Sequence, residues 1–214
     1  MLSYPLNEKT PIYGKKYAFQ IKEERQIRKK DTCNTFTLSF SNHSGTHIDA
    51  PRHCFNNGRC LEQYDINELI FNRPHILNLR KGKNELITGD DLKGISKCDI
   101  LLIRTGFYKL RGLNEYIFHN PGFSAQAANF IREKCPWIKA IGIDTISISG
   151  YQNRPEGRQA HRILLTNSGY PGKPLLLIED MDLSAGSLSL KKVFVVPLYV
   201  KKIDSAPCTV IGEF

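Results

Sequence analysis

The sequence predicts a single α/β domain: a mixed β-sheet with a few helices and an additional β layer. Short apolar stretches of strand character recur along all 214 residues, and only one or two stretches between them have a helical pattern. The composition, 41% hydrophobic and 24% charged, is ordinary for a globular protein with a sizeable core. Because no good linker interrupts the chain, residues 1–214 are expected to form one domain.

The first forty residues favour extended structure. TPIYG, residues 10–14, is a turn-bounded extended segment, and KYAFQIKEE, residues 16–24, alternates apolar and polar side chains near its start. In NTFTLSF, residues 34–40, the apolar side chains at 36, 38 and 40 have the period of two that predicts a strand. This strand leads directly into the most unusual stretch of the chain.

The remaining elements follow from runs of apolar residues. LEQYDINELIF, residues 61–71, predicts a short helix, and SAQAANFIREKC, residues 124–135, predicts the clearest helix, with Ser124 as its N-cap. The continuous apolar run at 98–106 is typical of a strand buried on both faces. Further strands are expected within 74–80, 137–148, 174–184, 191–203 and 205–214.

Three of the six histidines, with an aspartate among them, lie in NHSGTHIDAPRHC, residues 42–54. A glycine, a proline and β-branched residues make this stretch a poor helix, so it is interpreted as a turn entering a short strand. His47 and Asp49 then share one face of the strand, and His53 returns from the following loop. These groups and His43 could converge on one point, which metal binding requires and ordinary packing does not.

Other polar residues are candidates to complete such a site. Glu179 follows a continuous apolar run, and Asp144 ends another; a buried carboxylate needs a partner, and a cation is one. Among the remaining histidines, His75, His119 and His161, each taken alone is more typical of a surface or satisfied core residue than of a ligand.

Several function classes are disfavoured. No run of eighteen apolar residues predicts a membrane span, and the N-terminus lacks the apolar core of a signal peptide. Six scattered cysteines without a CxxC pair argue against a zinc ribbon, and without a secretion signal they are expected to be reduced thiols in a cytoplasmic protein. Cys54 is interpreted as a partly buried apolar residue rather than a reactive one. The net charge of +9 includes the basic run at 22–30, which two glutamates interrupt, so a solvated surface is favoured over nucleic-acid binding.

A family resemblance is carried by these same residues. HSGTHIDAPRH, residues 43–53, resembles the signature HxGTHxDxPxH of the metal-dependent hydrolases grouped around kynurenine formamidase and the putative cyclases. DILLIRTGF, GIDTISI, AHRILL, LIEDMDL and the closing VVPLYVKKIDSAPCTVI resemble later segments of the family, so the likeness spans most of the chain. It implies a swivelling β/β/α cyclase-like fold, commonly assembled as a homodimer or larger.

The resemblance also implies a site with two divalent metal ions, Zn²⁺ or Mn²⁺, whose ligands would be His43, His47, Asp49, His161 and Glu179. The first three would hold one ion, Asp49 and Glu179 would bridge to the second, and His161 would complete it. His53 would be the general acid/base rather than a ligand. Tyr13, where formamidases typically carry tryptophan, and the long stretch between His161 and Glu179 would border the substrate.

The function expected from this site is hydrolysis of an amide bond in a small molecule, with a formamide as in arylformamidases or a cyclic amide as the substrate. The alternatives on the same centre are opening of a cyclic amide as in isatin hydrolysis, lactone hydrolysis and cyclisation. A protein that keeps the metal without turnover is a further alternative, although the presence of His53 counts against it. The last alternative is that the protein is a basic module that binds nucleic acid.

Overall fold

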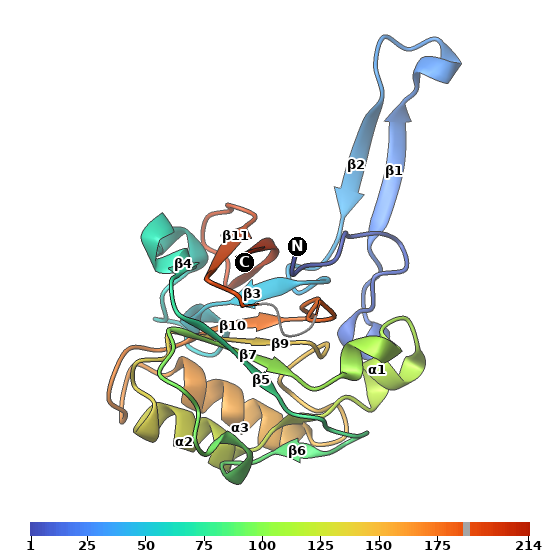
Figure 1. The fold of residues 1–214 in the computed structure, drawn as a ribbon. Helices are drawn as coiled ribbons and strands as arrows, with labels where there is room; N and C mark the ends of the chain where they lie inside the picture. Colours follow the sequence, from blue (N-terminus) through green and yellow to red (C-terminus); the bar gives the residue numbers. More distant parts are fainter. Residues whose placement is uncertain (186–188) are drawn as a thin grey trace.

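The computed structural model describes residues 1–185 and 189–214, which are organised around an eight-stranded mixed sheet (Figure 1). In spatial order its strands are β4 (Ile70–Phe71), β11 (Lys192–Pro197), β12 (Ser205–Glu213), β3 (His47–Asp49), β10 (Leu176–Glu179), β9 (Ala140–Ile143), β7 (Ile100–Arg104) and β5 (Pro74–Asn78). Strands β10, β9, β7 and β5 pair in parallel, whereas the pairings from β4 to β10 through β3 are antiparallel. The predicted mixed α/β architecture is confirmed.

Apolar side chains cover both faces of the parallel half of the sheet. On β7, Leu101 and Ile103 pack into the core beneath the helices, while Ile100 and Leu102 pack into a second core on the opposite face. The continuous apolar run at 98–106 therefore does form a strand buried on both faces, as predicted. This parallel half of the sheet meets β3 through β10, its first strand.

Two helices, α2 (Ala125–Lys134) and α3 (Arg154–Leu165), lie side by side on one face of the sheet (Figure 1). Helix α2 matches the prediction, and the Ser124 hydroxyl accepts the backbone N–H of Ala127 as its N-cap. Helix α3 was not predicted, because its first half is polar and contains Gly157. That glycine is required by packing: a Cβ there would lie 2.5 Å from the Cα of Ser149.

Several short elements differ from the sequence expectations. Residues 61–71 do not form a short helix; they make 3₁₀ turns at Leu61–Gln63 and Ile66–Leu69, followed by β4. Three further short elements were not predicted. Two of them are strands that pair in parallel, β6 (Leu86–Ile87) and β8 (Gly122–Phe123), and the third is helix α1 (Asn114–Phe118), which precedes β8. The remaining 3₁₀ turns are Tyr13–Lys15, Ile27–Lys29, Pro51–His53, Asp90–Leu92 and Phe107–Leu110; the first lies within the segment expected to be extended.

A β-hairpin projects from the body of the molecule (Figure 1). It consists of β1 (Gln20–Arg25) and β2 (Thr35–Ser39), and is called the arm below. The period-two pattern correctly predicted strand β2, but Phe36 and Leu38 are 54% and 53% exposed rather than part of the core. The basic run at 22–30 lies on the arm and is almost entirely exposed. This agrees with the prediction that the run forms a solvated surface. Among the described residues, no helix is long and apolar enough to cross a membrane.

Candidate metal centre

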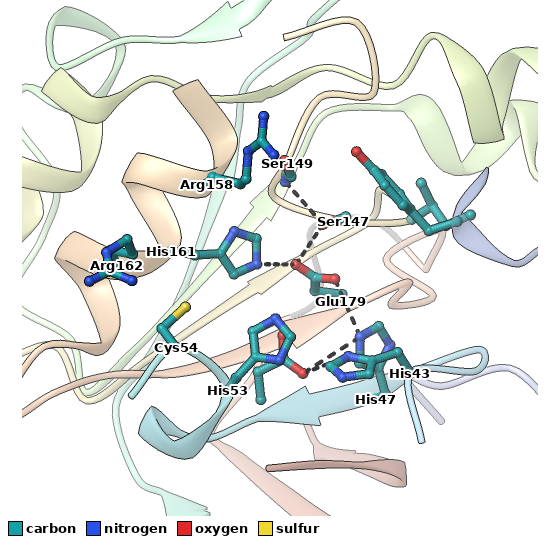
Figure 2. Close-up of a pocket in the computed structure, with 13 residues that line it drawn as sticks. His43, His47, His53, Cys54, Ser147, Ser149, Arg158, His161, Arg162 and Glu179 are labelled. Carbon is teal, nitrogen blue, oxygen red and sulfur yellow. Dashed lines mark hydrogen bonds and ion pairs between the residues drawn. The ribbon is translucent and has the colours of Figure 1, made fainter. Parts of the chain in front are cut away.

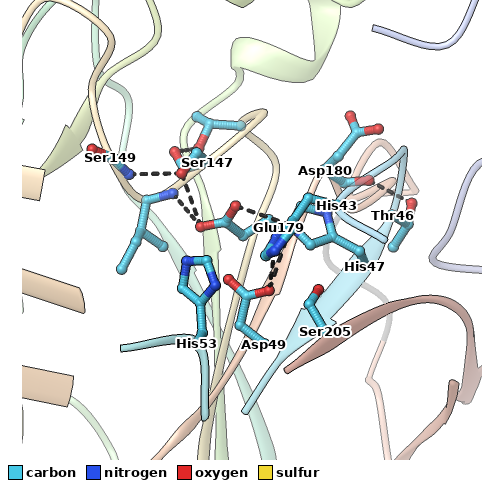
Figure 3. Close-up of polar contacts among 12 residues, drawn as sticks. His43, Thr46, His47, Asp49, His53, Ser147, Ser149, Glu179, Asp180 and Ser205 are labelled. Atoms are coloured by element: carbon cyan, nitrogen blue, oxygen red, sulfur yellow. Dashed lines mark hydrogen bonds and ion pairs between the residues drawn. The ribbon is translucent and has the colours of Figure 1, made fainter. Parts of the chain in front are cut away.

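The centre forms where β3 lies between β10 and β12 (Figure 3). His47 and Asp49 are two residues apart on β3 and therefore point to the same face. The register places Glu179 of β10 opposite His47, and Ser205 of β12 opposite Asp49. Two neighbouring strands, β3 and β10, thus bring one imidazole and two carboxylates together inside the protein, and β12 flanks them on the other side of β3.

His47, Asp49 and Glu179 form the buried part of the centre. Each is less than 4% exposed, and the ligand atoms of the three lie within 4.8 Å of one another. His47 Nδ1 donates to the carbonyl of Gly45 at 2.8 Å, which leaves Nε2 directed at Glu179 Oε2, 3.3 Å away, and at Asp49 Oδ1, 3.7 Å away. Backbone anchoring of one ring nitrogen is the usual way to orient the other toward a metal.

A second group shares Asp49 with the first. His43, Asp49 and His53 also have ligand atoms within 4.8 Å of one another, and His43 Nδ1 lies 3.3 Å from Asp49 Oδ1. Asp204 lies next to both of these histidines: its Oδ2 is 3.2 Å from His43 Nε2 and 2.7 Å from His53 Nδ1. This carboxylate fixes the orientation of both rings.

His161 approaches from α3 (Figure 2). Its Nδ1 is 2.8 Å from the carbonyl of Gly157, one turn earlier, and its Nε2 is 3.4 Å from Glu179 Oε1. The same carboxylate oxygen of Glu179 accepts the Ser147 hydroxyl at 3.0 Å and the Ile148 backbone N–H at 2.8 Å. Glu179 therefore has one oxygen toward His161 and the other toward His47.

The structure brings every residue of the predicted site to one cavity of about 450 Å³. The predicted site residues that line it are His43, His47, Asp49, His53, His161, Glu179 and Tyr13. Asp144 does not join them, because it accepts the backbone N–H groups of Thr105 and Gly106 and the Thr105 hydroxyl. His75, on β5, and His119, beside Asn84, also lie outside the cavity.

The sequence reasoning did not single out some residues that contribute to the site. Asp204 could have been found as the one acidic residue in the closing segment VVPLYVKKIDSAPCTVI, directly before the strand that pairs with β3. Ser147 and Ser149 also line the cavity and follow β9, but a serine after a strand does not by itself indicate a site. Arg158 and Arg162 line the cavity from the unpredicted helix α3.

Burial and charge act against each other at these residues. Burial disfavours the charged imidazole of His43, but Asp49 and Asp204 outweigh it and raise the pKa of His43 to about 10. Burial alone would raise the pKa of Asp204, yet hydrogen bonds with His43 and His53 hold it below its usual value. The pKa of Glu179 is lowered in the same way, against burial, by His161 and His47. The carboxylates therefore stay ionised at neutral pH and attract cations.

The donor set fits a divalent metal ion. Among residues 1–185 and 189–214, His47 Nε2 and Asp49 Oδ1 find no hydrogen-bond partner although both atoms are buried, and both point into the centre. An unpartnered buried polar atom is costly, and an ion between them would supply the missing interaction. Imidazole and carboxylate ligands together suit Zn²⁺ and Mn²⁺. The geometry is thus that of a metal site with Asp49 shared between two ligand groups.

Beside the centre, Cys54 lines the cavity as a half-buried residue. Burial and the charge of Asp49 raise the pKa of its thiol to about 11. A thiol with a raised pKa is a poor nucleophile at neutral pH. The structure therefore favours the interpretation of Cys54 as a packing residue.

Comparison with known families agrees with this geometry. The putative cyclase family matches residues 1–149, more than half of the 214-residue chain. The chain belongs to this family. An uncharacterized protein of Methanocaldococcus jannaschii is 30% identical over 195 residues, 89% of each chain. A kynurenine formamidase from Bacillus thuringiensis is 26% identical over 210 residues, 96% of this chain and 92% of that protein.

Solved structures confirm the predicted fold class. Isatin hydrolase A from Labrenzia aggregata aligns with a TM-score of 0.81 at 20% identity, over 99% of this chain and 91% of that one. A structure described as a potential metal-dependent hydrolase with cyclase activity aligns with a TM-score of 0.75 at 25% identity, over 99% and 94% of the two chains. Together with the kynurenine formamidases, these matches place the chain among the hydrolases of the family.

Proposed function

We propose that this protein is a metal-dependent amide hydrolase that cleaves the C–N bond of an arylformamide or a cyclic amide. The observation that carries the proposal is the convergence of His43, His47, Asp49, His161 and Glu179 on one cavity. Two buried atoms there, His47 Nε2 and Asp49 Oδ1, make no hydrogen bond to the described residues. The 26% identity to a kynurenine formamidase over nearly the whole chain supports formamides as the first substrates to test. The ions proposed are two per chain, with Zn²⁺ favoured and Mn²⁺ the alternative.

In this proposal the reaction adds the elements of water across the amide. The hydroxyl oxygen joins the carbonyl carbon, the C–N bond breaks, and the leaving nitrogen gains a proton. Bound divalent ions supply a water of lowered pKa and polarise the carbonyl. The remaining requirement is a group that moves a proton from the water to the nitrogen.

His53 is the residue proposed for the proton transfer. Asp204 accepts its Nδ1–H at 2.7 Å, which fixes the tautomer and leaves Nε2 as the basic nitrogen. An imidazole suits a proton shuttle near neutral pH because its ordinary pKa is close to 6.5. Asp204 is then a positioning residue that acts through His53.

The proposed activity is tested directly by measuring the hydrolysis products. Protein purified without chelator is loaded with Zn²⁺ or Mn²⁺ and incubated with N-formylkynurenine, formanilide, isatin and an aryl lactone. Turnover of a formamide or cyclic amide that stops after chelation and returns with the ion is the expected result. If metal-loaded protein hydrolyses neither amide class, the proposal is wrong, and hydrolysis of the lactone alone would assign a different substrate.

A cytoplasmic location is also proposed, on the basis of the thiols. All six cysteines are free, although three of them are exposed or only partly buried. Free thiols persist in reducing compartments. Quantitative labelling of unfolded protein extracted under acid quench should find six thiols per chain, and disulfides in that sample would contradict the location.

We propose further that the chain assembles as a homodimer or larger homo-oligomer, in which the arm packs against a second copy. Ile21, Phe36 and Leu38 share one face of the arm and are all exposed. A two-stranded hairpin is only marginally stable alone, so this apolar face gains stability when it is covered.

The assembly is measured by light scattering after size-exclusion chromatography. The wild type should have at least twice the 24.4 kDa mass of the chain, and Phe36→Ser with Leu38→Ser should lower that mass. Thr37→Ser, on the opposite face of β2, is the control. A monomeric wild type would rule out the proposed assembly.

A further inference from the structure

Two arginines stand on either side of His161. Arg158 and Arg162 are four residues apart on α3 and therefore leave the same face of the helix, and His161 lies three residues after Arg158. Figure 2 shows His161 directed at Glu179, with the two arginines beside it at the wall of the same cavity. Because the helix rises about 1.5 Å per residue, the two arginines are separated by about 6 Å along its axis. One carboxylate can therefore lie between them and accept hydrogen bonds from both.

Neither guanidinium has an acidic partner within the part of the chain that the structure describes. No side-chain hydrogen bond or ion pair joins Arg158 or Arg162 to residues 1–185 or 189–214. Arg162 lies over the Phe55 ring in a cation–π arrangement, 5.0 Å from its centroid. Arg59 and Arg111, in contrast, each pair with a carboxylate. Two carboxylates of the centre, Glu179 and Asp204, are paired with its histidines His47 and His53.

The rest of the cavity wall is suited to a flat apolar group. Tyr13 and Ile146 line it, and the Tyr13 ring is supported by Tyr151 at a centroid distance of 5.3 Å. A ligand that fills the cavity therefore meets polar metal-binding groups at its floor, apolar surface at one wall and two free guanidinium groups at another. An aromatic amide that also carries a negative charge matches all three.

We infer that Arg158 and Arg162 bind the carboxylate of the substrate, so the preferred substrates are aryl amides that carry a carboxylate on the leaving-group side. The planar guanidinium fork matches a carboxylate in geometry and charge, which makes arginine the usual residue for this recognition. This inference rests on the proposed amide hydrolysis and adds the substrate class. The two arginines are specificity residues and take no part in proton transfer.

The test compares an acidic substrate with its neutral counterpart. N-formylanthranilate and formanilide have the same reacting formamide and differ by one carboxylate. The wild type should prefer the acid in kcat/KM, and Arg158→Met with Arg162→Met should reduce that preference by about 10- to 100-fold, the usual scale for hydrogen bonds to a charged group. A wild type that treats both substrates alike would overturn the inference.

Control variants separate specific recognition from overall charge. Arg80→Met removes an exposed arginine that does not line this cavity, and should keep the wild-type preference for the acid. Arg158→Lys with Arg162→Lys keeps the charge and should recover part of the preference. If Arg80→Met reduces the preference as much as the cavity variants do, the effect is long-range charge and the inference fails.

A binding measurement separates this inference from the proposed activity. Calorimetric titration compares anthranilate, which carries the carboxylate, with 2-aminobenzamide, which is neutral, on metal-loaded and chelator-treated protein. Loss of anthranilate affinity in the double methionine variant supports the arginine site even if no amide is hydrolysed. Unchanged anthranilate affinity in that variant means that the carboxylate binds elsewhere, such as on the metal, and overturns the inference even if formanilide is a good substrate.

Discussion

Replacing Asp49 with asparagine is expected to remove metal binding and activity together. Asp49 Oδ1 lies in both ligand groups of the centre, 3.3 Å from His43 Nδ1 and 3.7 Å from His47 Nε2. The amide has the same shape but lacks the negative charge that a divalent ion requires. Loss of an outer partner of a metal ligand costs about 10–100-fold in affinity, so loss of the shared ligand itself should exceed this.

The measurement for Asp49→Asn is metal content by elemental analysis, with thermal unfolding to confirm that the variant folds. Asp91→Asn is a matched control, because Asp91 pairs with Lys81 away from the cavity and should not affect the metal. Full metal content in Asp49→Asn would show that the carboxylate is not shared between the two groups and that the described centre is wrong.

Replacing His53 with alanine is expected to leave the metal in place and to lower kcat by about 10²–10⁴-fold, the usual contribution of a general acid or base. The reason is its position: His53 is held by Asp204 at the open side of the centre and is more exposed than His47. Metal content and steady-state kinetics on the same preparation give both readouts. His119→Ala, outside the cavity, should change neither.

The structure makes this experiment decisive, because His53 also lies within ligand distance of His43 and Asp49. If His53→Ala loses metal in proportion to activity, the residue is a ligand and another group must move the proton. Asp204→Asn then helps to distinguish the two roles. As a positioning residue, Asp204 should mainly change kcat and its pH profile, because the ring of His53 loses its fixed tautomer.

Most of the centre was predictable from the sequence because its residues are local. His43, His47, Asp49 and His53 lie within eleven residues, and strand alternation alone puts His47 and Asp49 on one face. Glu179 was a candidate because it follows a continuous apolar run, but Asp144 satisfied the same criterion, and only the family resemblance separated the two. His161 could be included only through the resemblance, since nothing in its immediate neighbourhood distinguishes a ligand from an ordinary polar residue. The roles of all six residues remain predictions.

The residues that were missed depend on topology. Asp204 approaches His53 because β12 pairs with β3, a contact between segments more than 150 residues apart. Arg158 and Arg162 reach the cavity because α3 packs closely on the loop at Ser149, which Gly157 permits. Likewise, the alternation in β2 predicts a strand but does not say that its apolar face is exposed on a projecting arm. Periodicity describes one segment at a time, whereas these features need the register between segments.

The most direct test of the central claim is the number of metal ions per chain, measured by elemental analysis on tag-free protein purified without chelator. The five proposed ligands, His43, His47, Asp49, His161 and Glu179, predict close to two Zn²⁺ or Mn²⁺ ions per chain, which should be lost on chelation and regained on addition of the ion. A protein that holds no ion after incubation with Zn²⁺ or Mn²⁺ and desalting would contradict the account, because the convergence of these histidines and carboxylates would then need another explanation.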